Sequence, residues 1–288
     1  MSLLAAERAE VPSPQSVMIR ARGENFPVAS IVLPRRARRH LLAIYGFARL
    51  VDELGDSYSG DRDAALTWLE QELDRAFRGD ATHPLMVRLQ PTLRECSLAR
   101  GPFARLIEAN RVDQRVSRYA TWEQLRAYCA LSADPVGELV LAVFGRASEE
   151  LVGLSDSVCT GLQLAEHLQD VAEDLAVDRI YLPLEDMERF GCAEADLRAV
   201  HAGPALRALI AFEVARAREL LDVGADLGRA LRGRERLAVA GFAGGGMAAL
   251  AAIERAGYDV LPGPPKASRP SQLASAARML RRAGRARL

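Results

Sequence analysis

The chain has 288 residues, of which 49% are hydrophobic and 26% are charged, so a disordered or fibrous protein is excluded. Lys plus Arg and Asp plus Glu both number 38, and this zero formal net charge argues against a nucleic-acid-binding protein. Four cysteines without a CxxC pair exclude a zinc knuckle and a thioredoxin site, and they predict a reduced, cytoplasmic protein. The first fifteen residues hold two acids and two prolines, so no signal peptide is expected.

Apolar residues recur at helical spacing, which predicts an all-α protein with helices at 34–55, 61–77, 84–98, 102–118, 121–146, 149–177, 204–231 and 234–257. Asp61 and Thr121 stand at N-cap positions, and Pro135 predicts a bend or a break. The run Leu261-Pro-Gly-Pro-Pro265 ends the compact region. We therefore predict one helical domain over 1–265 and a basic tail over 266–288, which has seven Lys or Arg and no acid.

The most apolar stretch, Leu237–Ile253, is slightly short and only weakly hydrophobic for a membrane span. We predict a packed helix there, near a membrane surface. Its glycines Gly244, Gly245 and Gly246 each cost about 1 kcal/mol relative to alanine in a helix. Two explanations remain open: free space for a substrate or an ordered water, or close packing between helices.

A polar stripe lies on a helix that is otherwise apolar. Tyr45, Arg49, Asp52 and Asp56 are spaced i, i+4, i+7 and i+11, so they share one face. Because unpaired buried charges are costly, this stripe predicts a polar cavity. The plainer interpretation is an Arg49–Asp52 ion pair at an ordinary acidic helix end.

A second helix, within Gly161–Pro183, stacks Glu166, Asp170 and Asp174 one turn apart, which is unfavourable without a compensating charge. The stack is either a solvated acidic face or a binding site for a divalent cation. Carboxylates without convergent His or Cys favour Mg²⁺, or Mn²⁺, over zinc. None of the four histidines has a glutamate three residues before it, so the Glu-x-x-His pattern of a di-iron bundle is absent.

The order of these motifs resembles the squalene/phytoene synthase family. An aromatic-rich helix with Tyr45–Asp56 comes first, then Tyr128-Cys-Ala-Leu-Ser-Ala-Asp-Pro-Val-Gly137, then Gln169–Asp174 and Arg179-Ile-Tyr-Leu-Pro183. The resemblance implies a single-domain isoprenoid-synthase bundle around a central cavity. It further implies that Asp52, Asp56, Asp170 and Asp174 bind Mg²⁺, that Arg49, Arg179 and Tyr181 hold diphosphate or shape the site, and that Tyr45, Tyr128 and Gln169 line the cavity.

Within the family, the opening Glu24-Asn-Phe-Pro-Val-Ala-Ser30 and the stretch from Gly241 to Leu261 resemble the bacterial hydroxysqualene synthase branch. Enzymes of that branch take presqualene diphosphate and trap the rearranged cation with water, in squalene and hopanoid biosynthesis. Asn25 then stands where relatives place a diphosphate-binding Ser-x-Ser. Two departures are Glu53, in place of the second acid of DDxxD, and Glu166, where an Asn is common.

This resemblance implies a prenyl diphosphate substrate and no nicotinamide cofactor. It also suggests contact with other enzymes of the squalene pathway. The alternatives are a head-to-head prenyl synthase that condenses two farnesyl or geranylgeranyl diphosphates, and an inactive family member that acts as a partner protein. Leu273, Ala276, Ala277 and Leu280 have helical spacing, so the basic tail is either a short helix on the inner face of a membrane or a solvated segment.

Overall fold

The computed structural model describes residues 32–284, and this part of the chain is helical with one isolated parallel bridge between Arg118 and Ile180. The first helices are α3 Arg35–Asp52, the π-helical turn η4 Glu53–Ser57, α4 Arg62–Arg78, α5 Pro84–Glu95, α6 Arg100–Asp113, α7 Trp122–Ser132 and α8 Asp134–Val143. They are followed by α9 Glu149–Gln169, α10 Val171–Ala176, α11 Leu184–Arg189, the 3₁₀ turn η5 Glu194–Arg198, α12 Pro204–Asp222, α13 Gly224–Ala230, α14 Gly233–Arg255 and α15 Arg269–Gly284. The all-α prediction is confirmed.

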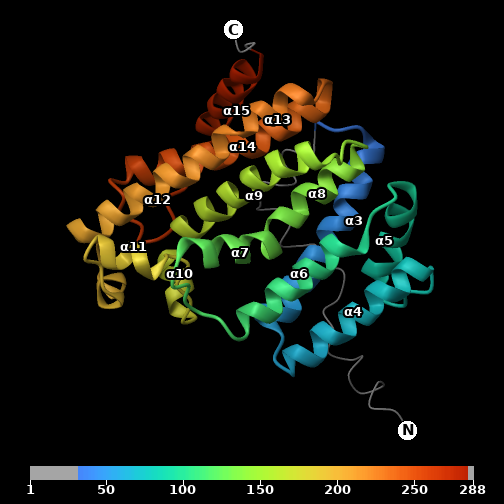
Figure 1. Ribbon diagram of the computed structural model, residues 1–288, viewed down its shortest axis with the longest axis horizontal. Helices are drawn as coiled ribbons and strands as arrows, with labels where there is room; N and C mark the ends of the chain where they lie inside the picture. The colour runs from blue at the N-terminus through green and yellow to red at the C-terminus, as the bar shows by residue number, and fades with distance from the viewer. Residues whose placement is uncertain (1–31, 285–288) are drawn as a thin grey trace.

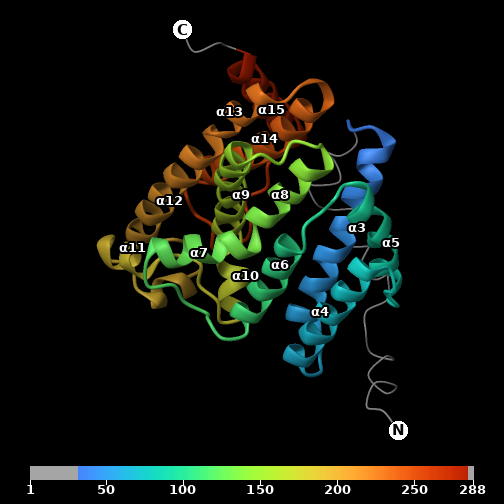
Figure 2. The same cartoon turned by 45° about the vertical axis from the view of Figure 1, so that its right-hand side comes forward.

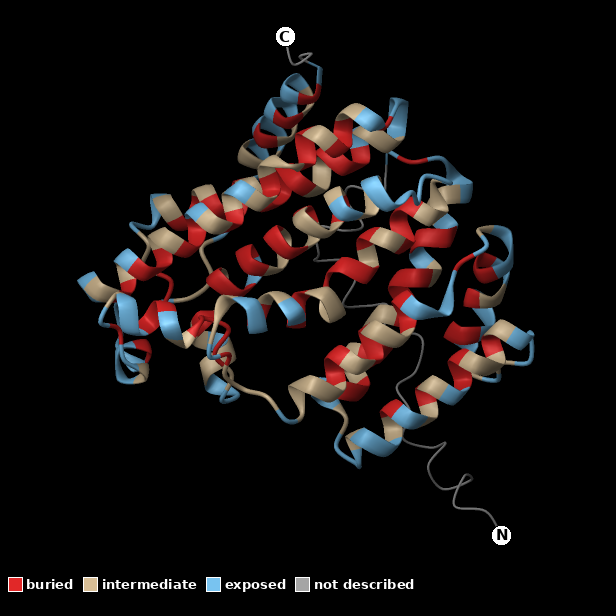
Figure 3. Cartoon of the chain, in the orientation of Figure 1, coloured by how far each residue is buried: buried red, intermediate tan, exposed pale blue. Residues whose placement is uncertain are grey.

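The helices form a bundle in which α9 is central (Figures 1 and 2). Helix α9 packs against α8 on one side and against α12 and α14 on the other, while α3 to α6 form one end of the molecule. Buried residues follow the inward faces of these helices (Figure 3). One apolar cluster fills the end made by α3 to α6, where the rings of Phe47 and Phe103 meet edge to face at 5.0 Å. A second cluster surrounds α9, α12 and α14.

Local signals set several helix boundaries as the sequence predicts. The Asp61 carboxylate accepts a hydrogen bond from the Ala64 amide at 3.0 Å, and the Thr121 hydroxyl accepts one from Gln124. Pro135 lies in the first turn of α8, so the predicted helix 121–146 is two helices. The prediction of one helix over 149–177 was wrong, because the backbone leaves helical geometry at Asp170, with φ −103° and ψ 14°.

Helix α14 is the one helix among residues 32–284 that is long and apolar enough to cross a membrane, but 61% of its most apolar window is buried inside the molecule. Its glycines are explained mainly by close packing. A Cβ atom at Gly244 would lie 2.5 Å from the backbone nitrogen of Ala276, and one at Gly246 would lie 2.7 Å from Leu162. Gly245 has no heavy atom within 4 Å of such a Cβ.

The segment predicted to be a basic tail contains helix α15, which packs on α13 and α14. Ser275, Met279 and Ala283 form its buried face, and Arg282 pairs with Asp222 of α12. Leu273 on the opposite face is 73% exposed. The tail therefore has a packed face and an exposed basic face.

Replacing Gly244 by Ala should lower the free energy of unfolding by about 1–3 kcal/mol, because the added methyl group meets backbone that cannot move aside. Gly245→Ala is the matched control: it adds the same group to open space and should leave stability unchanged or raise it by up to about 1 kcal/mol. Chemical denaturation of both variants measures the difference. Equal effects would contradict the packing explanation.

Candidate functional site

A cavity of about 340 Å³ lies between α3, α6, α7 and α9 and the segment that follows α10. Six carboxylates and two arginines line it: Asp52, Asp56, Asp113, Glu166, Asp170, Asp174, Arg49 and Arg179. The acids at 52 and 56 come from the end of α3, and those at 166, 170 and 174 come from α9 and α10. Two acidic groups that are more than a hundred residues apart in sequence thus border one cavity.

Most of the residues that the sequence singled out meet here. Besides Asp52, Asp56, Asp170, Asp174, Arg49 and Arg179, both Tyr128 and Tyr181 line the cavity. Tyr45 is buried one turn before Arg49 but is not part of the lining. Gln169 does not line it either, because its side-chain amide donates to the carbonyl of Pro265. Asn25 lies outside the described residues.

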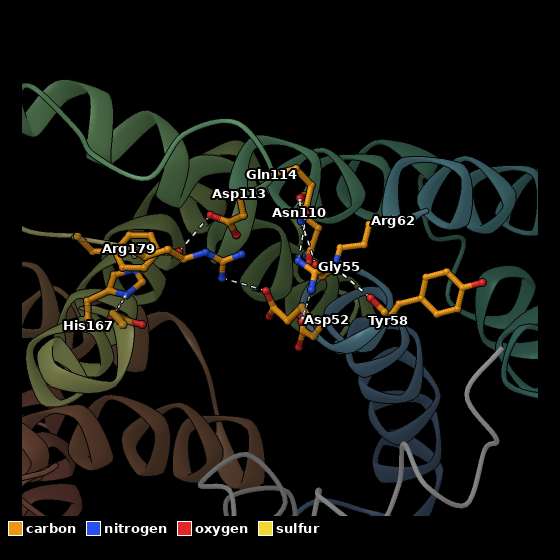
Figure 4. A network of polar contacts seen from close by, with 12 residues as sticks. Asp52, Gly55, Tyr58, Arg62, Asn110, Asp113, Gln114, His167 and Arg179 are labelled. Atoms are coloured by element: carbon orange, nitrogen blue, oxygen red, sulfur yellow. Dashed lines mark hydrogen bonds and ion pairs between the residues drawn. The ribbon is translucent and has the colours of Figure 1, made fainter. Parts of the chain in front are cut away.

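The first acidic pair lies across a change of helix type. Asp52 ends α3 and Asp56 lies in the π-helical turn η4, where Gly55 faces Asn110 so closely that a Cβ atom would lie 1.9 Å from the Asn110 amide oxygen. The Gln114 amide donates to the Gly55 carbonyl at 2.9 Å. Figure 4 shows this network at the end of α3. The close contact explains why residue 55 is a glycine.

Arg62 completes the support of this turn. Its guanidinium donates to the carbonyls of Asp56 at 3.0 Å and Tyr58 at 3.2 Å, and to the Gln114 side chain at 3.4 Å. Backbone carbonyls that the ordinary helical pattern leaves without a partner are therefore bound by side chains. The Asp56 carboxylate is consequently fixed at the edge of the cavity.

The second acidic set is arranged by the break at Asp170. The Asp170 backbone amide still donates to the Glu166 carbonyl at 3.0 Å, and the Asp174 amide donates to the Asp170 carbonyl at 2.8 Å. The chain therefore keeps its direction through the break. Burial, together with the neighbouring Glu166, raises the pKa of Asp170 to about 6. This carboxylate is thus destabilised in its charged form.

Each arginine meets one acid of the first pair. Arg49 lies 3.3 Å from Asp52, so the predicted ion pair is present, and it lies in the cavity wall. Arg179 donates to Asp56 at 2.9 Å across 123 positions of sequence. The Arg179–Asp56 pair therefore joins the two sides of the cavity, and Figure 4 shows Arg179 reaching toward the end of α3.

Asp113 is a site residue that the sequence analysis missed. Its carboxylate accepts hydrogen bonds from the hydroxyls of Tyr128 at 2.7 Å and Tyr181 at 3.1 Å, and burial raises its pKa. The Tyr181 ring stacks on His167 at 3.8 Å and on Tyr128 at 5.6 Å. The sequence does hold a signal for this residue. Asn110 and Asp113 are spaced i and i+3 on α6, so they share one face of that helix, as Arg49 and Asp52 do on α3.

The charge of the cavity fits hard divalent cations bound together with an anion. Among residues 32–284, no three His, Cys, Asp or Glu side chains converge closely enough to form a metal site on their own. Mg²⁺ commonly takes only one or two protein carboxylates and completes its shell with water and phosphate oxygens. Two facing acidic groups with two arginines between them provide that kind of donor set.

Asp170→Asn should stabilise the metal-free protein at pH 7, because it removes a carboxylate that is unfavourable in the folded state. The folded-state pKa lies above the unfolded value of about 3.9, so the destabilisation by Asp170 is complete above about pH 6 and disappears toward pH 4. The melting-temperature advantage of the variant should follow the same course. The control is Glu219→Gln, which removes an exposed carboxylate on α12 and should leave the melting temperature nearly unchanged at every pH. An advantage that did not change with pH would contradict this assignment.

The chain is similar to known proteins over most of its length. The family model for squalene/phytoene synthase matches residues 19–271. A hydroxysqualene synthase from Rhodopseudomonas palustris is 35% identical over 208 residues, covering 72% of this chain and 70% of that protein. A presqualene diphosphate synthase from the same organism is 32% identical over 210 residues, covering 72% and 75%.

Among solved structures, squalene synthase HpnC from Alicyclobacillus acidocaldarius aligns with a TM-score of 0.80 and 48% identity, covering 85% of this chain and 93% of that one. These similarities confirm the resemblance that the motifs indicated. The chain belongs to the squalene/phytoene synthase family, and it is an enzyme of the kind that uses prenyl diphosphates.

Proposed function

We propose that this protein is a hydroxysqualene synthase. It ionises presqualene diphosphate, rearranges the resulting cation and captures it with water. The observation that supports this most directly is the cavity, in which acids from α3 and its π-turn face acids from α9 and α10, and which Arg49 and Arg179 also line. The similarity to a hydroxysqualene synthase, reported above, points to the same reaction.

Mg²⁺ fits the site, and Mn²⁺ is the alternative. Asp52 and Asp56 would bind it from one side, and Asp170 and Asp174 from the other, with Glu166 adding a charge to the second group. When bound, the metal supplies positive charge that stabilises the diphosphate as it leaves with the bonding electrons.

The protein's own groups complete the site. Arg49 and Arg179 donate hydrogen bonds to the diphosphate and neutralise part of its charge. Arg179 now donates to Asp56, so a metal bound at Asp56 would free its guanidinium for the diphosphate. The rings of Tyr128 and Tyr181 line the same cavity, where an aromatic face can stabilise a carbocation. Asp113 fixes both rings through their hydroxyls.

A second, apolar cavity borders the first and has room for only a short part of a prenyl chain. It measures about 90 Å³ and shares Val136 with the polar cavity. Its lining is almost entirely apolar and consists of Val136, Gly137, Val140, Leu141, Ser155, Val158, Cys159, Leu162, Leu227, Val239 and Phe242. An apolar cavity next to an anion-binding one fits an isoprenoid diphosphate.

The second candidate is the head-to-head condensation of two farnesyl or geranylgeranyl diphosphates. The similarity to a presqualene diphosphate synthase favours it. An inactive partner protein is the third possibility. It is less well supported, because all four metal-binding candidates and both arginines line the cavity together.

The proposal predicts that the protein with Mg²⁺ converts presqualene diphosphate into a C30 alcohol and diphosphate. Water adds through its oxygen and loses one proton, so no reductant is required, and NADPH should not change the product. Mass spectrometry after incubation in ¹⁸O-labelled water should show one heavy oxygen in the alcohol. Asp52→Asn and Asp170→Asn, which remove one carboxylate from each acidic group, are the controls and should form no product.

Squalene that forms only with NADPH would contradict the water-capture step and favour a reductive synthase. Turnover of farnesyl diphosphate alone, without use of presqualene diphosphate, would favour the condensation. Failure of the protein to release diphosphate from either substrate would favour the inactive partner.

We also propose that the protein is cytoplasmic and contacts the inner face of the membrane and other enzymes of the squalene pathway. Arg269, Leu273 and Arg281 of α15 are exposed, while the opposite face of that helix packs on the core. Because the membrane is where a C30 product partitions, a basic and partly apolar surface there would favour its release.

Arg269→Gln/Arg281→Gln should weaken binding to vesicles that contain phosphatidylglycerol by roughly thirtyfold, since each juxtamembrane cation contributes about 1 kcal/mol. Arg88→Gln/Arg115→Gln removes two exposed charges outside α15 and is the matched control. Co-sedimentation measures both. Equal binding by the two variants would contradict membrane contact through α15.

A further inference from the structure

The segment that presents Arg179 and Tyr181 to the cavity is held by the connection between α6 and α7. The Ile180 amide donates to the Ser117 carbonyl at 2.9 Å, and the Leu184 amide donates to the Tyr119 carbonyl at 2.9 Å. The two irregular segments therefore lie side by side in parallel over residues 117–119 and 180–184. The placement of Arg179 depends on this contact.

Arg118 lies at the centre of the contact and uses all five of its N–H donors. Its Nη1 donates to the carbonyls of Asp178 at 2.6 Å and Ser117 at 2.9 Å. Its Nη2 donates to the Asp178 carboxylate at 2.8 Å and to Glu194 at 3.2 Å, and its Nε donates to Glu194 at 2.9 Å. One planar guanidinium thus binds both the backbone and the side chain of Asp178.

Asp178 is the left-handed residue that ends α10: the amides of Asp178 and Arg179 donate to the carbonyls of Leu175 at 3.0 Å and Asp174 at 2.9 Å. Arg118 adds a bond to the carbonyl and one to the carboxylate of the same residue. The φ of Asp178, +60°, lies in the left-handed region, which residues other than glycine adopt less often. The next residue is Arg179, whose guanidinium reaches Asp56 at 2.9 Å. A change of φ at 178 would redirect the chain at the point where Arg179 enters the cavity.

We propose that Arg118 is a positioning residue for the diphosphate site: together with the capping bonds of α10, it holds Asp178 in the left-handed conformation that directs Arg179 into the cavity. The inference rests on the proposed function only in assigning diphosphate to Arg179. Lysine cannot replace Arg118, because an ammonium has three donors at one atom and cannot span two carboxylates and two carbonyls.

The contribution of Arg118 to stability is expected to be small. The Arg118 side chain is 22% exposed, whereas those of Asp178 and Glu194 are 80% and 41% exposed, and pairs with such exposed partners contribute little to stability. Removing Arg118 should therefore change the melting temperature only slightly. Its effect should appear in the binding of diphosphate.

The test measures the binding of inorganic pyrophosphate with Mg²⁺ by calorimetry, which does not depend on the identity of the prenyl substrate. Arg118→Ala and Arg118→Lys should both lose at least tenfold in affinity and approach Arg179→Ala. Arg115→Ala removes an exposed arginine three residues earlier and should bind like the wild type. Wild-type affinity in Arg118→Ala, or in Arg179→Ala, would overturn the inference.

A rescue variant separates positioning from a general loss of charge. Glycine adopts positive φ without a steric penalty, so Asp178→Gly in the Arg118→Ala background should recover part of the lost affinity. No recovery, or a large fall in melting temperature in Arg118→Ala, would show that Arg118 acts by another route. A wild-type protein that binds pyrophosphate but forms no hydroxysqualene would contradict the proposed function and leave this inference standing.

Discussion

Repulsion between like charges is the constraint on which the rest of this structure depends. Within residues 32–284, six carboxylates border one cavity, and two arginines face them there. Such a site is stable only if the surrounding structure fixes each group, because the carboxylates would otherwise separate and become solvated. At two places, the break at Asp170 and the π-turn at Glu53–Ser57, the backbone departs from regular helix geometry. Holding these carboxylates close together is unfavourable, and a bound cation would offset that repulsion.

The C-terminal end of α6 and the residues after it provide most of the fixation. Asn110 and Gln114 contact the π-turn, Asp113 accepts the hydroxyls of two cavity tyrosines, and Arg118 binds the backbone next to Arg179. A stretch of nine residues therefore contacts both sides of the cavity. This arrangement links the two acidic groups through one continuous stretch of chain, although they come from distant parts of the sequence.

The sequence predicted the helical class, the capped boundaries and eight of the cavity-lining residues, because apolar spacing and caps are local signals and the motifs have a fixed order. It did not predict the break at Asp170, since the helical spacing of apolar residues continues from α9 through that position into Val171–Ala176. It placed Gln169 in the cavity, whereas a contact with Pro265, ninety-six residues away, turns that side chain elsewhere. Asp113 went unnoticed because its importance comes from two tyrosines on other elements. Such features depend on tertiary contacts, which no local pattern contains.

The π-turn has a consequence for how this segment can change length. Each residue of an α-helix turns the chain by about 100°. A deletion of one residue within Glu53–Ser57 would let an ordinary helix continue, yet it would rotate Asp56 away from the side on which Arg179 stands. Substitutions at the exposed Ser57 or Ser59 leave that geometry intact, whereas Leu54 and Gly55 are fixed by burial. The number of residues between Asp52 and Arg62 is thus constrained in addition to the identity of the buried ones, so that insertions and deletions should be rarer here than replacements of exposed residues.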